Sequence, residues 1–422
     1  MTLLQRFKDL PAWARFSTTA ALGILVLSIV QSLEAGGASR LTADTASGSM
    51  LRWSIPILLA GLGGLYAERA GIVNIGLEGM MILGTWFGAW GALQWGPWGG
   101  LAAGLVGGGL GGLVHAIATV GFGVDHIISG VAINITAPGV TRFLSDQIFT
   151  GYKGGSITQS PAVDGLGKIT VPVLAGGDVF GATTPNLLGT VDDWEIFFLS
   201  DIAGFMRGFM AGVSIFTVIA IALVPISAWL LWRTRFGLRL RIAGENPHAG
   251  ESLGVNIYRS KYVGVVISGA LAGLAGAFIA MELTGFYRQN QTTGRGFIGL
   301  AALIFGNWKP GGILAAAFLF GYPFGISLRD LDGTSTHALL LLTALALAGA
   351  TAWAIRKQNR TDALLAGSLG LIMLVWYLLS DTAPRWLPST MPFAIVVLVL
   401  VFANQRLRPP AADGQIYRKG ET

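Results

Sequence analysis

The sequence predicts an all-α, polytopic integral membrane protein with about 10–12 transmembrane helices. Of its 422 residues, 53% are hydrophobic and only 12% are charged, and an average soluble domain carries roughly twice that charged fraction. Long apolar stretches recur, for example 209–232, 263–281 and 391–402. Basic residues gather beside such stretches, as at 233–241 and 406–408. This is the positive-inside pattern of membrane proteins, so the net charge of +6 does not indicate a nucleic-acid partner.

Apolar stretches place the spans along the chain. We expect them near residues 18–33, 53–67, 77–93, 98–120, 126–144, 203–232, 262–284, 297–307, 311–328, 337–355, 363–380 and 391–403. With a cytoplasmic N-terminus, the basic clusters fall on the inner side, the acidic segment 146–201 falls outside and the C-terminus is cytoplasmic.

The same pattern predicts the organisation of the chain. The expected parts are an N-terminal membrane half (1–145), an external loop (146–202), a second membrane half (203–330) with a cytoplasmic coupling loop (233–261), an inserted helix hairpin (331–390), and a last span with a cytoplasmic tail (391–422).

One expected span is too short to cross a bilayer. A helix over 297–307 reaches only about 16 Å, so it must be half of a crossing that neighbouring helices protect. The string FIGL at 297–300 resembles NIGL at 74–77, and each follows an apolar span and a polar turn. The two turns fall on opposite sides of the membrane in the expected topology. This predicts an inverted-repeat core whose broken helices flank a central path.

Polar residues inside the expected spans are candidates for lining that path. Asn74 and Glu78 are four residues apart and would share one face of a helix. A carboxylate in a span is costly, so Glu78 faces either a water-filled path or a neighbouring broken helix that it caps. Asn134 and Thr136 lie in span 126–144 and either line the path or bond an adjacent helix.

The cytoplasmic loop has the signals of a short helix. Asn246 is a suitable N-cap, Pro247 suits the first turn, and Gly254 can follow the last. A short helix held between two spans is suited to docking on a motor subunit. The residues expected to form this coupling segment are Glu245, Asn246, Pro247, Ala249, Glu251, Leu253 and Gly254.

Several enzyme signatures are missing from the sequence. It has no cysteine, no P-loop and no Gly-x-Ser-x-Gly or His-Glu-x-x-His motif. We therefore expect no catalytic residues, no metal, no cofactor and no ATP hydrolysis by this chain. Two other functions stay open at this point. One is an ion-coupled secondary transporter with Glu78 as its coupling carboxylate, and the less favoured one is an intramembrane enzyme.

Four strings carry a resemblance to a known family. ERAGIVNIGLEGMM (68–81), GENPHAGESLGVN (244–256), GRGFIGLAALIFGNWKP (294–310) and MPFAIVVLVLVF (391–402) resemble permeases of ABC importers, as does the tail 409–419. The most similar branch is related to ribose and branched-chain amino acid permeases and includes nucleoside-type permeases. The resemblance implies a multi-pass protein of the cell (inner, cytoplasmic) membrane that imports nucleosides or related small polar solutes. In that family, 247–254 would be the coupling helix.

The resemblance also implies partners. They are cytoplasmic P-loop ATPase subunits, a second permease subunit that is usually a paralogue, and an external substrate-binding protein, often a lipoprotein. The sequence departs from the family in two places. The external segment 151–200 is longer than expected, and 331–388 resembles an insertion that carries the spans 337–355 and 363–380. A pair of added spans would preserve the topology on either side.

Overall fold

The computed structural model describes residues 12–33, 41–179, 181–327, 334–356, 358–384, 386–387, 390–391 and 407–420. The expected last span, 391–403, lies outside these residues apart from Met391. Helices make up most of the described chain, and each of its strands has two residues. The predicted all-α membrane fold is confirmed.

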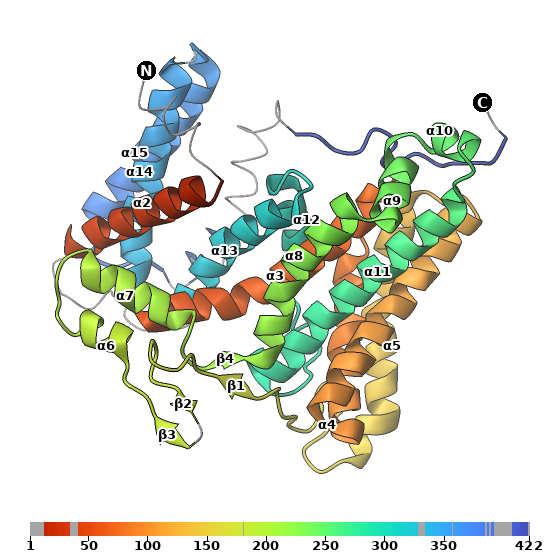
Figure 1. Cartoon of the computed structure of the whole chain (residues 1–422), viewed down its shortest axis with the longest axis horizontal. Coiled ribbons are helices and arrows are strands. Elements are labelled where there is room, and N and C mark those ends of the chain that lie inside the picture. The colour runs from red at the N-terminus through yellow and green to blue at the C-terminus, as the bar shows by residue number, and fades with distance from the viewer. Residues whose placement is uncertain are drawn as a thin grey trace. The chain divides into compact units, whose positions relative to one another are not determined.

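The elements follow one another along the chain in Figure 1. The helices are α2 (Ala12–Leu33), α3 (Asp44–Arg69), α4 (Leu77–Ala116), α5 (His126–Ile148), α6 (Leu187–Asp192), α7 (Leu199–Gly208), α8 (Ile215–Arg233), α9 (Arg235–Glu245), α10 (Pro247–Ser252), α11 (Ile257–Phe278), α12 (Arg295–Phe305), α13 (Pro310–Ser327), α14 (Thr334–Arg356) and α15 (Arg360–Leu379). π-helical turns extend α4 (Ile117–Gly121) and α11 (Ile279–Thr284), and a 3₁₀ turn (Phe149–Gly151) follows α5. The strands are β1 (Lys168–Ile169), β2 (Asp178–Val179), β3 (Ala182–Thr183) and β4 (Val213–Ser214), paired as β1–β4 and β2–β3.

Within the described residues, 7 helices are long and apolar enough to cross a membrane. One of them, α4 with its π turn, is a hairpin of two helical arms. Gly96 has φ 74° and breaks the helix, and a Cβ atom on Gly107 would lie 2.5 Å from the Phe87 ring. The arms therefore run back along each other. They correspond to the expected spans 77–93 and 98–120.

The expected span 203–232 is wrong as a single helix. α7 ends at Gly208 and α8 begins at Ile215, with Gly212 at φ 61° between them. A positive φ cannot continue a right-handed helix. The break is invisible to hydropathy because residues 209–214 are mostly apolar or small. α8 alone has 19 residues, which is enough to cross.

The chain forms two compact units, and the segments of the two units alternate along the sequence. The first contains residues 1–51, 169–213 and 322–391, and the second contains 52–168, 214–321 and 392–422. In the first unit α14 and α15 pack as a hairpin, and α14 also contacts α2. The two added spans are thus helices of the expected length, while the linear division into membrane halves, loop and insertion remains a prediction.

Glycine contacts join α4 to α11 in the second unit. A Cβ atom on Gly108 would lie 2.3 Å from the Gly269 carbonyl oxygen, and one on Gly84 would lie 2.2 Å from that of Gly273. Only glycine permits the two backbones to come this close. In lipid no hydrophobic driving force holds helices together, so close van der Waals packing of this kind stabilises the pair. The helices α4, α5 and α11 consequently lie side by side in Figure 1. This packing positions the broken helices described next.

Candidate functional site

The start of α4 is anchored by α5. The Asn134 side chain accepts a hydrogen bond from the Gly79 amide (2.7 Å) and donates one to the Ile75 carbonyl (2.9 Å). A helix that begins inside the membrane leaves backbone groups without intrahelical partners. Asn134 satisfies one donor and one acceptor there. This use of Asn134 is the helix-contact alternative left open by the sequence.

Glu78 joins the start of α4 to the start of α12. Its carboxylate accepts hydrogen bonds from the Thr292 hydroxyl (2.6 Å), the Gly294 amide (2.8 Å) and the Gly296 amide (2.7 Å). These amides are at the first turn of α12, where donors lack helical partners and the helix dipole favours a negative charge. The contacts match the capping interpretation of Glu78. Its part in a substrate path remains a prediction.

A buried arginine also stabilises this turn. Arg295 is 7% exposed, and its Nη1 donates to the carbonyls of Gln291 and Thr292, each at 3.0 Å. Its guanidinium lies 4.6 Å from the centre of the Trp53 ring, a cation–π contact. The same Nη1 also donates to the Thr293 hydroxyl at 2.6 Å, and a sequence pattern does not reveal contacts of these kinds.

Asn74 is not on a helix as expected, and its place in a substrate path remains a prediction. It lies in the turn before α4, so it does not share a helix face with Glu78. Its Nδ2 donates to the Ser268 hydroxyl at 2.9 Å, while its buried Oδ1 has no hydrogen-bond partner among the described residues. An unpaired buried oxygen is costly and suits a site that water or a solute enters.

Thr136 does not join this group. It is exposed on α5 and donates to the Ala132 carbonyl of its own helix at 2.7 Å. The structure thus brings Asn74, Glu78 and Asn134 to the start of α4 and leaves Thr136 apart.

The coupling segment has the predicted local structure. The Asn246 side chain caps α10 by accepting from the Ala249 amide at 3.0 Å, and Pro247 occupies the first turn. Gly254 has φ 76° just after the helix, a conformation that favours glycine there. Leu253, at the end of α10, is 77% exposed.

Contacts between residues far apart in the sequence hold α9 and α10 in place, and the sequence alone does not predict them. Arg69 pairs with Glu245 at 3.3 Å and donates to the Trp308 carbonyl at 3.0 Å. The Trp308 indole donates in turn to the Glu68 carboxylate. The strings 68–81, 244–256 and 294–310, far apart in sequence, therefore meet at one junction.

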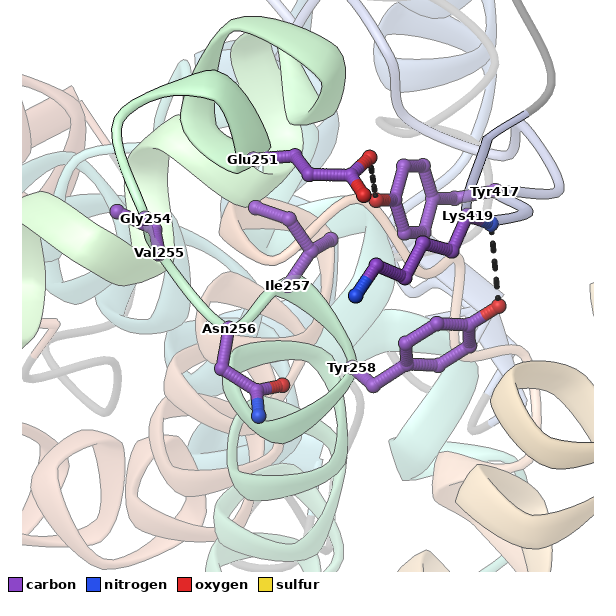
Figure 2. Close-up of a pocket in the computed structure, with 8 residues that line it drawn as sticks. All are labelled: Glu251, Gly254, Val255, Asn256, Ile257, Tyr258, Tyr417 and Lys419. Carbon is purple, nitrogen blue, oxygen red and sulfur yellow. Dashed lines mark hydrogen bonds between the residues drawn. The ribbon is translucent and has the colours of Figure 1, made fainter.

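The C-terminal segment also reaches this junction. The Ala412 amide donates to the Gly244 carbonyl (2.8 Å), and the Ala411 amide donates to the Glu245 carboxylate (3.2 Å). Farther along, the Tyr417 hydroxyl donates to the Glu251 carboxylate. A pocket of about 280 Å³ lies beside this contact, and Figure 2 shows the residues that line it. Its lining residues are Glu251, Gly254, Val255, Asn256, Ile257, Tyr258, Tyr417 and Lys419.

Two groups of the C-terminal segment have shifted pKa values. Burial raises the pKa of Asp413 from 3.8 to about 7, although a hydrogen bond with Glu68 and the positive charge of Lys261 offset part of the rise. Burial, helped by the adjoining Glu251 carboxylate, raises the pKa of Tyr417 to about 12. The Tyr417 hydroxyl is therefore protonated, and able to donate, at neutral pH. Among the described residues no three His, Asp or Glu side chains gather as a metal site would require.

The fold and these junctions define a polytopic helical transport protein with a broken-helix core and a capped helix in a loop between spans. Residues 48–324 match the family described as branched-chain amino acid transport system / permease component. This match covers more than half of the chain, so the protein belongs to that family. The matched region ends before the α14–α15 hairpin.

Known permeases give concordant similarities. A nucleoside ABC transporter permease protein of Lactococcus lactis is 38% identical over 283 residues, which are 65% of this chain and 78% of that one. A guanosine ABC transporter permease protein of Bacillus subtilis is 35% identical over 321 residues, 71% of this chain and 89% of that one. A glucose ABC transporter permease protein of Haloferax volcanii is 24% identical over 360 residues, 81% and 88% respectively. No solved structure gives a significant match.

The family settles the class of transporter. The chain is a multi-pass membrane permease subunit of an ABC importer, rather than an ion-coupled carrier. Permeases of this kind work with ATPase and substrate-binding partners.

Proposed function

We propose that this permease subunit imports nucleosides. Two of the similar permeases described above carry nucleoside or guanosine in their names, and the third carries glucose. A nucleoside contains a sugar with hydroxyl groups, so the three names share a polar solute chemistry. We place both termini in the cytoplasm, as the basic clusters at 233–241 and 406–408 favour.

The working assembly in this proposal contains more than one kind of subunit. It pairs the chain with a second, paralogous permease and with cytoplasmic P-loop ATPases, and an external lipoprotein delivers the solute. The segment 151–200, on the expected external side, would meet the binding protein. Asn74 is the strongest path candidate, because its buried Oδ1 has no partner among the described residues. Glu78 and Asn134 hold the broken helices that form the wall of the path.

The helix α10 is the proposed contact with the ATPase. The observation that carries this proposal is a helix capped at both ends, by Asn246 and Gly254, that ends in the exposed Leu253. An exposed leucine on a small, fixed helix can enter an apolar groove of a partner. The coupling residues are those predicted from the sequence: Glu245, Asn246, Pro247, Ala249, Glu251, Leu253 and Gly254.

The test is co-purification with a direct substitution on α10. The tagged chain, expressed with its own operon or host partners and extracted in mild detergent, should retain a P-loop ATPase and ATPase activity. Leu253→Asp should remove the ATPase and abolish uptake of radiolabelled guanosine by cells. Leu187→Asp, at a leucine of α6 that is 49% exposed, is the matched control and should leave ATPase binding unchanged. An unchanged ATPase yield with Leu253→Asp would contradict the proposed coupling site.

A further inference from the structure

The C-terminal segment 408–419, here called the C-terminal strap, follows the coupling segment along its length. Its backbone is held at three successive places. The Arg408 amide donates to the Asn307 side chain (2.9 Å), the Ala412 amide donates to the Gly244 carbonyl (2.8 Å), and the Lys419 amide donates to the Tyr258 hydroxyl (3.4 Å). The strap thus connects the turn after α12 to α9 and to the start of α11.

Tyr417 is the side chain by which the strap holds α10. It is 9% exposed and packs in an apolar cluster with Ala243 and Ile257. Its ring centre lies 5.4 Å from that of His248 on α10 and 5.5 Å from that of Tyr258 on α11. Figure 2 shows the Tyr417 ring next to Glu251, whose carboxylate accepts a hydrogen bond from the Tyr417 hydroxyl.

α10 depends on such contacts because of its length. It has six residues, and a helix this short is not stable by itself in water. Its N-cap fixes where it begins but not how it lies against α11. Tyr417 touches α10 through His248 and Glu251 and touches α11 through Tyr258. A charge-assisted hydrogen bond combined with two ring contacts of the buried Tyr417 side chain holds one turn of helix in place.

We propose that the C-terminal strap is part of the coupling apparatus and that Tyr417 is a positioning residue, which holds α10 against α11 so that movement of the ATPase reaches the membrane helices. This rests on the proposed contact between α10 and the ATPase. Without Tyr417, α10 would still present Leu253 to the ATPase but would swing on the loops at its two ends. ATP would then be hydrolysed without matching transport.

The first experiment measures solute transported per ATP hydrolysed by the complete transporter in proteoliposomes. Tyr417→Ala should retain the ATPase on purification and lower this ratio about tenfold, the effect of losing one charge-assisted hydrogen bond with its ring contacts. Tyr417→Phe keeps the ring and loses only the hydroxyl, so it should lower the ratio less. Gln415→Ala is the matched control, because Gln415 is exposed and its side chain donates to the Ala411 carbonyl within the strap itself.

A covalent tether distinguishes positioning from general stability. The chain has no cysteine, so introduced thiols are the only ones in this subunit that react. In the double variant His248→Cys, Tyr417→Cys, a short bifunctional thiol reagent should restore the ratio, whereas Tyr417→Cys alone should not respond. The complex with the cysteine-free permease, treated with the same reagent, controls for thiols in the partners.

The outcomes separate the two proposals. If the wild-type transporter couples transport to ATP hydrolysis and Tyr417→Ala transports as much solute per ATP, the role of the strap is overturned. The proposed function is then left intact. A cross-linked double variant that remains uncoupled also overturns the role of the strap. This second test still decides the question if Tyr417→Ala does not fold. A wild-type chain that binds no ATPase overturns the proposed function and, with it, this inference.

Discussion

Glu78 illustrates how a charge inside a membrane protein can be structural. Its carboxylate accepts hydrogen bonds from Thr292, Gly294 and Gly296 at the start of α12, and only 7% of the residue is exposed. The sequence located this carboxylate but left two interpretations of it, because its partners lie more than two hundred positions away. Asn74 and Asn134 were found in the same way, by their polarity inside apolar segments. Arg295 was not assigned, since its contacts with its own turn and with the distant Trp53 ring leave no pattern in the sequence.

Replacing Glu78 tests the capping contact. Glu78→Ala leaves two backbone amides of α12 without an acceptor, so we expect a loss of roughly 3 kcal/mol in the free energy of unfolding. Glu78→Gln retains an acceptor and should cost less. Thermal unfolding of the purified protein in detergent measures both, with Thr136→Ala as the control at an exposed site. A Glu78→Ala protein as stable as the wild type would rule out the cap.

Asp413 predicts a pH dependence. Its pKa is about 7 in the folded protein and 3.8 ordinarily, so the folded state binds the proton more tightly than the unfolded state. The stabilisation is therefore complete below about pH 4 and is lost as the pH rises through about 7. We expect the unfolding temperature to fall between pH 5 and pH 8, and to fall less in Asp413→Asn. Equal pH profiles for the two proteins would contradict this assignment.

At the scale of elements, local signals predicted well and distant ones did not. The helix α10 was predicted correctly because its cap, first-turn proline and terminal glycine lie within nine positions of one another in the sequence. The short helix α12 was expected because the apolar stretch 297–307 is too short to cross a bilayer. The break between α7 and α8 was missed because it depends on the backbone at Gly212 and not on polarity. The strap was missed because its partners are formed only when three distant strings meet.

Changes at the two ends of α10 test whether its local structure supports coupling. Asn246→Ala removes the cap at a cost of about 1 kcal/mol, and Gly254→Val places a branched side chain at φ 76°. Each should lower solute-driven ATPase activity of the assembled transporter. Asn246→Asp keeps a capping oxygen and should behave like the wild type. Full activity in both Asn246→Ala and Gly254→Val would show that the helix itself is dispensable.

At the scale of the whole molecule, the sequence predicted a membrane protein and its broken-helix core but not the interleaving of two compact units. The units draw on three separate stretches each, and hydropathy is read along the chain in order. Orientation across the membrane is a prediction from the basic clusters, and it can be tested because the chain has no cysteine.

Single cysteines report that orientation. Leu253→Cys should react with a membrane-impermeant maleimide only when the cytoplasmic side is opened. Ile157→Cys, in the expected external segment, should react in intact cells. Both positions are exposed, so unequal labelling reflects the side of the membrane. The reverse pattern would invert the topology and move α10 away from any cytoplasmic ATPase.

We propose that this chain is the membrane path of an ATP-driven nucleoside importer, coupled through α10. The most direct measurement is uptake of radiolabelled guanosine by proteoliposomes that contain the purified complex. ATP is supplied on the side of the membrane that carries the ATPase, and the binding protein is supplied on the opposite side. We predict uptake that requires ATP and is abolished by Leu253→Asp while Leu187→Asp retains it. Uptake by this chain alone, without ATP or an ATPase subunit, would contradict the account.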